Sequence, residues 1–407
     1  FSGKVALSAV GHDVPKPRLF RPMVARDSNE SHRAATPLEL FTDLCFVVAV
    51  AQAAAEFHHA VAANHAAAGV ISFVMVFFAI WWAWLNFSWF ASAYDNDDVP
   101  YRLLTILQIV GVLILAAGIH RMYAGDFLLG VAGYVIMRVA LVIQWLRAAS
   151  QDPARSRTCR LYALGIVLVQ ILWVLYLWCP PTLKVPLFFT FVLAEFMVPV
   201  VAERAGRTTW HPHHIAERYG LFFIIVLGES ILSVTLAFQG MLNENRFQYQ
   251  AMCVVVGGIL TIFSMWWLYF SRNAALALER VLNGESLNGA YVWGFGHYFV
   301  FAAGAALGGG LASRVDYWTN REPISALASG VTVTVPVAVL IAALWFVQLR
   351  PHDCTIRTFG PFASAVGLVL LSTFSPAPEV LTGIICVALL VIELRMESRN
   401  HLKHVHG

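Results

Sequence analysis

Charged residues are scarce in this sequence. Only 13% of its 407 residues are Asp, Glu, Lys or Arg, about half of the roughly 25% that soluble domains carry. Hydrophobic residues make up 59%, and the mean hydropathy is +0.68. A soluble protein of this composition would need a core larger than single domains build, so the composition argues against a soluble enzyme. The net charge of +3 is also too small to indicate a nucleic-acid partner.

Signatures of common enzymes and metal sites are missing as well. The sequence has no C-x-x-C or H-E-x-x-H motif, no Walker A motif, no glycine-rich dinucleotide loop and no nucleophile elbow. Its six cysteines are scattered, and four lie in apolar runs, which is typical of small buried side chains. We therefore predict no cofactor. Residues 1–36 are polar and lack a signal-peptide core, and because the chain begins with Phe we expect its natural start to lie further upstream.

Apolar stretches near 20 residues recur along almost the whole chain, the length that crosses about 30 Å of hydrocarbon as a helix. The sequence therefore predicts an all-α, polytopic membrane protein. We place twelve spans at 38–58, 70–92, 101–120, 127–147, 160–179, 186–203, 216–238, 250–271, 289–312, 325–348, 357–375 and 378–396.

The Lys and Arg residues fall unevenly on the two sides of these spans. Most of the 27 lie on the side of the amino terminus. The other side carries Arg121, Lys184, Arg246, Arg314 and Arg321. Because basic loops stay in the cytoplasm, we expect a multi-pass protein of the bacterial inner membrane with both termini cytoplasmic, including the polar segment 1–36 and the tail 401–407.

The two halves of the chain, 37–205 and 206–400, resemble each other. The segment that begins at Glu39 aligns with the segment that begins at Glu217, and Trp84-Leu-Asn-Phe-Ser aligns with Trp267-Leu-Tyr-Phe-Ser. Six spans are an even number, so the halves would form two parallel six-helix repeats with a pathway between them. Similar aromatic-rich composition of the spans is the alternative explanation.

Ionisable residues within the spans are the candidate site, because an ionised group in the bilayer costs at least about 2.5–3.5 kcal/mol on insertion scales. Glu39 and Asp43 are four residues apart at the start of the first span and share one helix face. An acidic first turn favoured by the helix dipole would explain Glu39. It explains Asp43 less well, because an apolar run follows that residue directly, and we predict an interior role for Asp43.

Further candidates lie nearer the middle of the spans. Glu229 follows Gly228 near the centre of the seventh span, and Arg138 and Glu195 are also within spans. The alternative to a functional role is a structural salt bridge, with Arg138 as the partner suggested for Glu229. Other polar residues within spans are individually more typical of interhelical hydrogen bonds; they are Asn86, Ser88, Gln52, Gln108 and His297.

Asp95, Asp97 and Asp98 form a third cluster, in the segment Asp-Asn-Asp-Asp-Val-Pro-Tyr-Arg102. One interpretation is a helix junction in which Asp98 caps the third span and Pro100 lies in its first turn. The other notes that D-x-D-D resembles the acid motif of class II terpene cyclases, and that three carboxylates could hold Mg²⁺. On this interpretation the protein would be an intramembrane enzyme acting on a lipid or isoprenoid.

Histidines also cluster in the sequence. They occur at His58-His59, at His211-Pro-His213-His214, and at His401, His404 and His406. We expect these side chains to be solvated, as histidines of loops and tails usually are. Whether they bind a metal is left open.

Several of these segments together resemble the bacterial low temperature requirement protein A (LtrA) family. They are Pro37-Leu-Glu39-Leu-Phe-Thr-Asp43-Leu-Cys-Phe-Val, Trp81-Trp-Ala-Trp-Leu-Asn86-Phe-Ser, Asp95-Asn-Asp97-Asp98-Val-Pro-Tyr-Arg102 and Glu217-Arg218-Tyr-Gly220-Leu-Phe-Phe-Ile-Ile-Val-Leu-Gly228-Glu229. The resemblance implies a bacterial inner-membrane protein of about this span count. This sequence departs from the family pattern E-L-F-F-D at one position, where Thr42 replaces the second Phe. The family name describes a growth phenotype and implies no reaction.

We therefore predict a transporter or channel for a small ion or solute rather than an enzyme. Its pathway would be lined by Glu39, Asp43, Asn86, Arg102, Arg138, Glu217, Glu229 and His297. The alternatives are the lipid-processing enzyme using Asp95, Asp97 and Asp98, and a receptor or scaffold without catalysis. The expected partners are the lipid bilayer and a small ion, solute or lipid-like substrate, with homo-oligomerisation left open.

Overall fold

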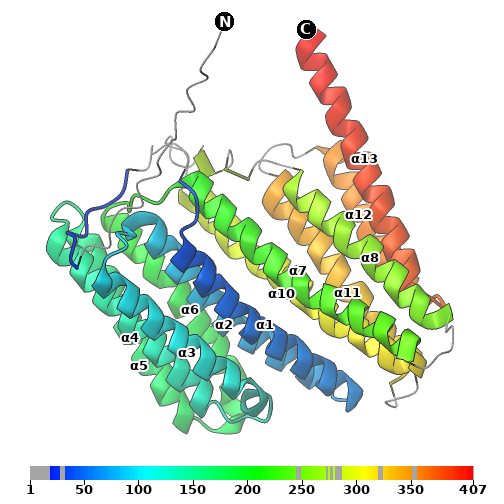
Figure 1. Cartoon of the computed structure of the whole chain (residues 1–407), viewed down its shortest axis with the longest axis horizontal. Helices are drawn as coiled ribbons and strands as arrows, with labels where there is room; N and C mark the ends of the chain where they lie inside the picture. The colour runs from blue at the N-terminus through cyan, green and yellow to red at the C-terminus, as the bar shows by residue number, and fades with distance from the viewer. Residues whose placement is uncertain are drawn as a thin grey trace, which may run out of the picture.

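The computed structural model describes residues 19–27, 33–243, 249–271, 274–275, 278–279, 287–319, 324–350 and 355–406. These residues form twelve α-helices and no strand (Figure 1). The helices are α1 (Pro37–Ala62), α2 (Ala66–Tyr94), α3 (Val99–Tyr123), α4 (Leu128–Gln151), α5 (Ser156–Leu175), α6 (Pro181–Ala205), α7 (Pro212–Asn243), α8 (Tyr249–Phe270), α10 (Leu287–Thr319), α11 (Ala326–Leu344), α12 (Ile356–Ser372) and α13 (Pro378–His406). A 3₁₀ turn, η1 (Tyr176–Trp178), follows α5, and a π-helical turn, η2 (Trp345–Leu349), follows α11.

Ten of the described helices are long and apolar enough to cross a membrane, from α1 to α8 together with α10 and α11. The all-helical fold is thus as predicted, but two of the twelve predicted spans do not meet the same criterion. Helix α12 has only 17 residues, about 25 Å at 1.5 Å per residue. Helix α13 has 29 residues, but it carries Glu379 in its first turn and Glu393 and Arg395 before the predicted span ends, so too many charges lie within its apolar stretch.

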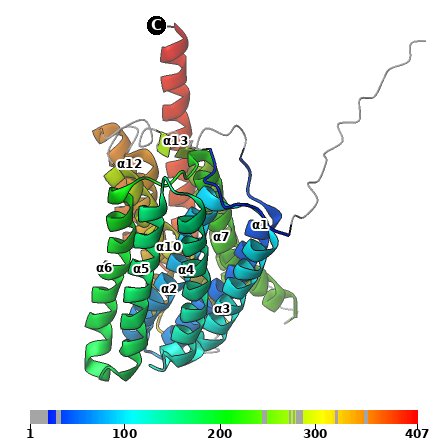
Figure 2. The same cartoon turned by 90° about the vertical axis from the view of Figure 1, so that its left-hand side faces the viewer.

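The helices lie side by side, with α1–α6 on one side of the bundle and α7–α13 on the other (Figures 1 and 2). Within the first group α3 packs on α4 and α1 on α2, and within the second α10 packs on α11 and α7 on α8. Helices α1 and α2 contact α7 and α10. We call this surface, on which α1 and α2 meet α7 and α10, the seam.

Local sequence signals set several helix starts. At α1 the Thr36 hydroxyl accepts from the Glu39 N–H and the Glu39 carboxylate accepts from the Thr36 N–H, a capping box with Pro37 in the first turn. At α3 the Asp98 carboxylate accepts from the Tyr101 N–H, so the predicted cap is confirmed. These caps fix where α1 and α3 begin at the same end of the bundle.

Glycines on α10 allow neighbouring helices to approach it closely. A Cβ atom at Gly309 would lie 2.8 Å from the carbonyl oxygen of Ala54 on α1, and one at Gly310 would overlap the carbonyl oxygen of Thr332 on α11. Small residues at such contacts are the usual means by which membrane helices pack closely. The seam therefore has a closely packed wall, and α10 brings side chains of the second half against α1.

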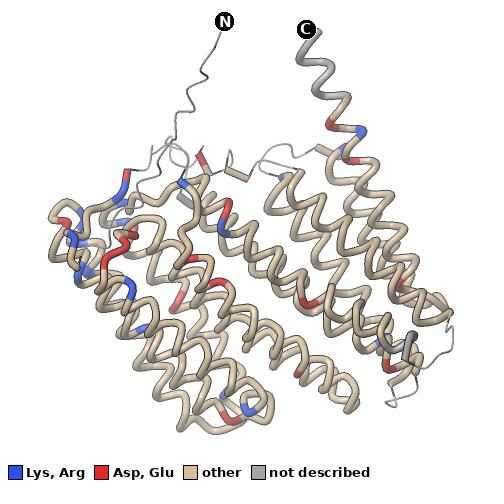
Figure 3. The backbone as a smooth tube through the Cα atoms, in the orientation of Figure 1, with Lys and Arg blue, Asp and Glu red and all other residues tan. Residues whose placement is uncertain are grey.

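Charged residues gather towards the ends of the helices. Among the residues that the structure describes, most Lys and Arg lie at the end at which α1 begins and α13 ends, as Figure 3 shows. The interior is largely aromatic and aliphatic, and it includes the fully buried Trp81, Trp82 and Trp84. The ionisable side chains that are nevertheless buried between helices are therefore exceptions that need partners or a function.

Candidate functional site

The predicted interior position of Asp43 is found on the seam. Its Oδ1 lies 2.7 Å from Nη2 of Arg218 on α7 and accepts a hydrogen bond of 2.8 Å from Nε1 of Trp84 on α2. The same Arg218 nitrogen donates to the hydroxyl of Ser88 at 3.1 Å. Asp43 and Arg218 are 2% and 0% exposed, so this contact is a buried ion pair that joins the first half of the chain to the second.

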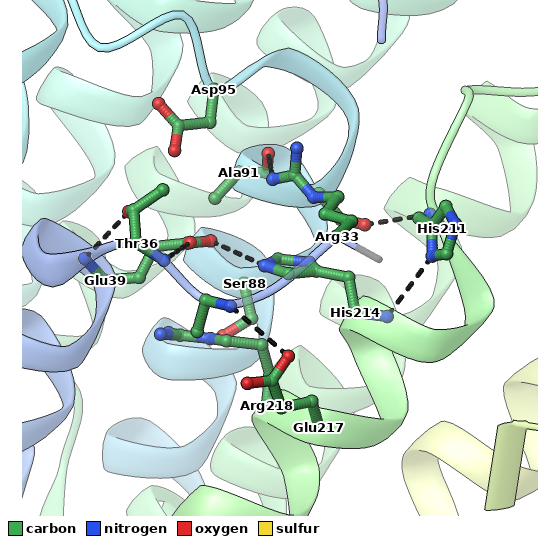
Figure 4. A network of polar contacts seen from close by, with 12 residues as sticks. Arg33, Thr36, Glu39, Ser88, Ala91, Asp95, His211, His214, Glu217 and Arg218 are labelled. Carbon is green, nitrogen blue, oxygen red and sulfur yellow. Dashed lines mark hydrogen bonds and ion pairs between the residues drawn. The ribbon is translucent and has the colours of Figure 1, made fainter. Parts of the chain in front are cut away.

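Glu39 has two roles at the same end of the seam (Figure 4). One oxygen completes the α1 capping box, as the helix-start explanation required. The other lies 3.0 Å from Nε2 of His214 on α7. His214 is fully buried, so the expectation that this histidine is solvated is wrong. The reason is that α7 begins at Pro212, four residues before the predicted span, and its first turn is packed against α1 and α2.

Arg33 and Asp95 lie beside this network, outside the helices (Figure 4). Arg33 donates from Nη2 to the carbonyl oxygen of Ala91 at 2.9 Å, near the carboxyl end of α2. Burial lowers the pKa of the Arg33 guanidinium, with Arg26 acting in the same direction and Glu39 and Asp95 opposing it. Burial also raises the pKa of Asp95 to about 6, helped by the charge of Glu39 and opposed by that of Arg33.

Several polar atoms of this cluster have no hydrogen-bond partner among the described residues. They are Nε and Nη1 of Arg33, Nε and Nη1 of Arg218, Oδ2 of Asp43, Oδ2 of Asp95 and the hydroxyl of Tyr101. A buried polar atom without a partner costs about 1–3 kcal/mol. Donors and acceptors both remain available, so this end of the seam favours polar solvent or a polar ligand over hydrocarbon.

The suggested pairing of Arg138 with Glu229 is wrong. Arg138 on α4 instead pairs with Glu195 on α6, with 3.4 Å between Nη2 and Oε2. The Glu195 carboxylate also accepts hydrogen bonds from Tyr134, Trp173 and Trp82 at 2.7–3.0 Å. All of these residues belong to the first six helices, so the pair lies inside one half of the chain.

Glu229 lies near the middle of α7 and faces a cavity of about 280 Å³. The cavity is bounded by α1, α7 and α10, and His58 and Asp316 also line it. Nε2 of His58 lies 2.6 Å from Oδ2 of Asp316, which joins α1 to α10 near the carboxyl ends of both helices. His58 is paired and about 18% exposed, so it is only partly solvated. Two predicted acidic positions, Asp43 and Glu229, therefore do lie on the seam.

The three aspartates of the D-x-D-D segment do not converge. Asp97 forms a bidentate contact with Arg102 at 2.7 and 2.8 Å, and both side chains are about half exposed. Asp95 accepts from the Asp97 N–H, while Asp98 contacts Arg147 of α4. Burial alone would raise the pKa of Asp98, but the hydrogen bonds from Arg147 and from the N–H groups of Arg21 and Tyr101 hold it below its ordinary value.

In the described part of the chain, no group of three or more His, Cys, Asp or Glu residues could hold a metal ion. Asp95, Asp97 and Asp98 thus offer no shared Mg²⁺ position there. The side chains of His401, His404 and His406 lie outside the described residues.

The remaining predicted residues have separate surroundings. Asn86 donates to the carbonyl oxygen of Trp82, and the exposed Glu217 accepts from the Ala35 N–H. His297 is fully buried among aromatic rings, with its Nδ1 2.7 Å from the carbonyl oxygen of Trp293. Gln108 donates to Gln144 across α3 and α4, an interhelical hydrogen bond of the expected kind. None of these contacts involves the ion pairs of the seam.

Sequence reasoning missed four residues of the seam and Arg33, which lies beside it. The sequence placed them in basic segments or among loop histidines, or gave them no role, because each lies within a few turns of a helix end. These residues are Arg33, Arg218, His58, His214 and Asp316. The available signal was charge balance: each of Glu39 and Asp43 needed a cationic partner, and the nearest candidates at the equivalent helix start are His214 and Arg218.

Comparison with known proteins assigns the chain to a family. Residues 34–394 match the family described as bacterial low temperature requirement A protein (LtrA). The chain belongs to the LtrA family. It is a multi-pass membrane protein, since ten helices in its described part are long and apolar enough to span a membrane, and the resemblance noted in the sequence is confirmed.

Other comparisons add little about function. This LtrA-family chain is similar to an uncharacterized protein of Rhizobium meliloti (strain 1021), with 24% identity over 392 residues that cover 90% of each chain. No solved structure matches it. In this LtrA-family protein, carboxylates, imidazoles and guanidinium groups lie together between helices on the seam.

Proposed function

We propose that this LtrA-family protein is a transporter or channel for a small ion or solute, with its pathway along the seam. The observation that carries the proposal is the placement of ionisable side chains along this one surface. Asp43–Arg218 and Glu39–His214 lie at one end of it. Glu229 and the His58–Asp316 pair line one cavity towards the other end. Carboxylates and histidines at membrane depth suit cation binding and proton relays.

The dimensions of α1 support a route that crosses most of the membrane. His58 follows Asp43 by 15 positions on this continuous helix, a rise of about 22 Å at 1.5 Å per residue. The hydrocarbon core is about 30 Å thick. The two polar ends of the seam therefore lie near opposite membrane surfaces.

The pathway would lie between two parallel repeats. In support, the helix contacts of the halves correspond: α1 with α2 and α7 with α8, then α3 with α4 and α10 with α11. The concentration of Lys and Arg at the end at which α1 begins supports a cytoplasmic location for both termini in the inner membrane. Homo-oligomerisation is compatible with this arrangement and is not required by it.

Flux through reconstituted protein tests the proposal. The full chain is placed in liposomes loaded with a pH-sensitive dye, which reports proton flux when a potassium diffusion potential is imposed. Uptake of radioactive sodium, rubidium and chloride is followed in parallel. We expect a flux above that of protein-free liposomes for at least one of these ions. Glu229→Gln and Asp43→Asn should each reduce its initial rate by tenfold or more, because both remove a charge from the route.

Glu56→Gln is the matched control. Glu56 is also a carboxylate of α1, but it contacts the exposed His120 of α3 at 2.9 Å, away from α7 and α10. Its replacement should leave the rate within about twofold of the parent protein. Rates are normalised to the amount of protein that elutes as a single folded species. Unchanged flux in both Glu229→Gln and Asp43→Asn would contradict the pathway.

A further inference from the structure

We propose that Glu229 is a proton-exchange site, which takes up and releases a proton through the cavity it shares with the His58–Asp316 pair. The inference rests on the proposed transport function and deepens it, because it identifies the proton as an ion that the seam handles. It assigns different work to the two ends of the seam: the Asp43–Arg218 end holds paired, fixed charges, and the Glu229 cavity is the part that titrates.

The cavity is built so that it surrounds the Glu229 carboxylate with open space. Its other walls are mainly small residues, including Ala54, Ala55 and Ala312. Gly308 lies beneath the side chain: a Cβ atom there would stand 2.8 Å from Cγ of Glu229. The volume of about 280 Å³ corresponds to several water molecules at about 30 Å³ each. A carboxyl group in such a space can exchange a proton with solvent.

Glu229, which is half-buried, differs in its partners from several acids that are fully buried between the helices. Within the described residues, no hydrogen bond or ion pair to its carboxylate is present, whereas Asp43, Glu195 and Glu379 each contact an arginine. No positive charge therefore holds the Glu229 carboxylate in its ionised form, and the cavity leaves it free to gain and lose a proton. A group that is neutral when protonated and costly when ionised is suited to carry a proton across the membrane interior.

The charged groups that face Glu229 come from two neighbouring helices. Helix α1 contributes His58, and α10 contributes Asp316. Helix α8, which also packs on α7, carries no Asp, Glu, Lys or Arg. Arg314 of α10 is held by Glu379 of α13 and by Ser329 of α11, on a different side of the helix from Asp316. The proton affinity of Glu229 therefore depends on His58 and Asp316.

The His58–Asp316 pair provides the connection to the membrane surface. Its two groups are 2.6 Å apart and about 15–18% exposed, so they contact both the cavity and the outside. An imidazole in contact with a carboxylate can accept a proton on one nitrogen and release it from the other. Protons would thus pass between solvent and Glu229 by way of this pair and the cavity.

Carbodiimide labelling tests the inference without any transport measurement. A hydrophobic carbodiimide such as dicyclohexylcarbodiimide adds to a protonated carboxyl group, and peptide mass spectrometry locates and quantifies the adduct. The full chain in lipid nanodiscs is labelled from pH 5 to pH 9. We expect an adduct on Glu229 whose yield falls at least tenfold as the pH rises across this range.

Two variants should move the midpoint of this labelling curve in opposite directions. Asp316→Asn removes a nearby negative charge, so Glu229 should lose its proton more readily and the midpoint should fall by about one pH unit. His58→Gln leaves the Asp316 charge without its partner, so the midpoint should rise. Glu56→Gln, outside the cavity, should leave it unchanged. A purely structural role of the pair would not produce opposite shifts.

Three results would overturn the proton site. They are the absence of an adduct on Glu229 at every pH, a yield that does not vary with pH, and midpoints unaffected by both variants. Protection of Glu229 by 150 mM sodium or potassium would assign the cavity to a metal cation instead. If labelling behaves as expected but no ion flux is found, transport fails while the proton site stands. If flux depends on Glu229 without a titrating adduct, the proton site fails while transport stands.

Discussion

Oδ1 of Asp43 on α1 lies 2.7 Å from Nη2 of Arg218 on α7, although the two residues are 175 positions apart in the sequence. Each belongs to the first helix of its half of the chain. Trp84 and Ser88 of α2 hydrogen-bond to the two partners, which fixes the carboxylate and the guanidinium in place. The pair therefore couples the two groups of helices at one end of the seam.

Breaking this pair from one side should destabilise the fold. Asp43→Asn leaves the buried Arg218 charge without its counter-ion, and removal of one partner of a buried pair typically costs about 3–5 kcal/mol. We expect a clear decrease in the apparent melting temperature in detergent, followed by tryptophan fluorescence or heated size-exclusion chromatography.

The double variant Asp43→Asn with Arg218→Gln is the informative control for that prediction. With both charges removed, much of the loss should be recovered, because a neutral pair avoids the buried uncompensated charge. Additive losses in the double variant would show that the two residues act independently and that the contact is not an energetic pair.

The Glu195 network should behave as a structural element only. Glu195→Gln places an amide among Tyr134, Trp173, Trp82 and Arg138, all of which donate to the present carboxylate. One acceptor is lost and the Arg138 charge is no longer neutralised, so thermal stability should fall by about 3–5 kcal/mol.

Transport by the folded fraction of that variant is expected to stay within about threefold of the parent, because Arg138 and Glu195 lie within the first six helices and away from the seam. A tenfold loss of flux per folded molecule would instead place Arg138 and Glu195 in the pathway, as the sequence first suggested.

The fold was largely predictable because its signals are local. Length and hydropathy indicated most helices, Pro37 with Glu39 indicated the start of α1, and Asp98 with Pro100 indicated the start of α3. Local rules were less reliable at the carboxyl end, where hydropathy indicated spans for α12 and α13 that the helix lengths and charges do not support in full.

Partner identities were not predictable in the same way. In a soluble helix the polar face marks the exterior, but in a membrane both the lipid-facing and the protein-facing sides are apolar. On α1, Phe41 and Leu44 are exposed whereas Phe46 and Val50 are buried, and nothing in their chemistry separates them. The pairing of Asp43 with Arg218 thus depends on helix packing over 175 positions. A helix start placed four residues late also removed His214 from consideration as an interior residue.

Asp95 should give the protein a measurable pH dependence of stability. Because burial raises its pKa to about 6 in the folded chain, against about 3.9 when unfolded, the folded state holds this proton more tightly. Between about pH 4 and pH 6 the folded state binds more protons, so this contribution makes stability fall as the pH rises.

Asp95→Asn should remove that contribution, and thermal scans at pH 5 and pH 7 measure it. The variant should gain stability relative to the parent at pH 7 and gain less at pH 5. Asp97→Asn is the comparison, because Asp97 is an exposed neighbouring carboxylate. This variant should change the stability by the same amount at pH 5 and at pH 7. If the difference in stability between pH 5 and pH 7 is the same in Asp95→Asn as in the parent protein, this pH dependence does not come from Asp95.

Two glycine substitutions should separate close helix packing from helix propensity. Gly310→Ala on α10 introduces a Cβ atom that overlaps the carbonyl oxygen of Thr332, so α10 and α11 must move apart. Overpacking of this kind typically costs about 1–3 kcal/mol, and we expect a lower apparent melting temperature and a lower yield of folded protein. Gly367→Ala on α12 meets no atom within 4 Å and should be neutral or stabilising by about 0.5–1 kcal/mol, because alanine favours the helix over glycine. Equal effects of the two substitutions, measured in the same nanodiscs, would mean that α10 does not approach α11 through Gly310.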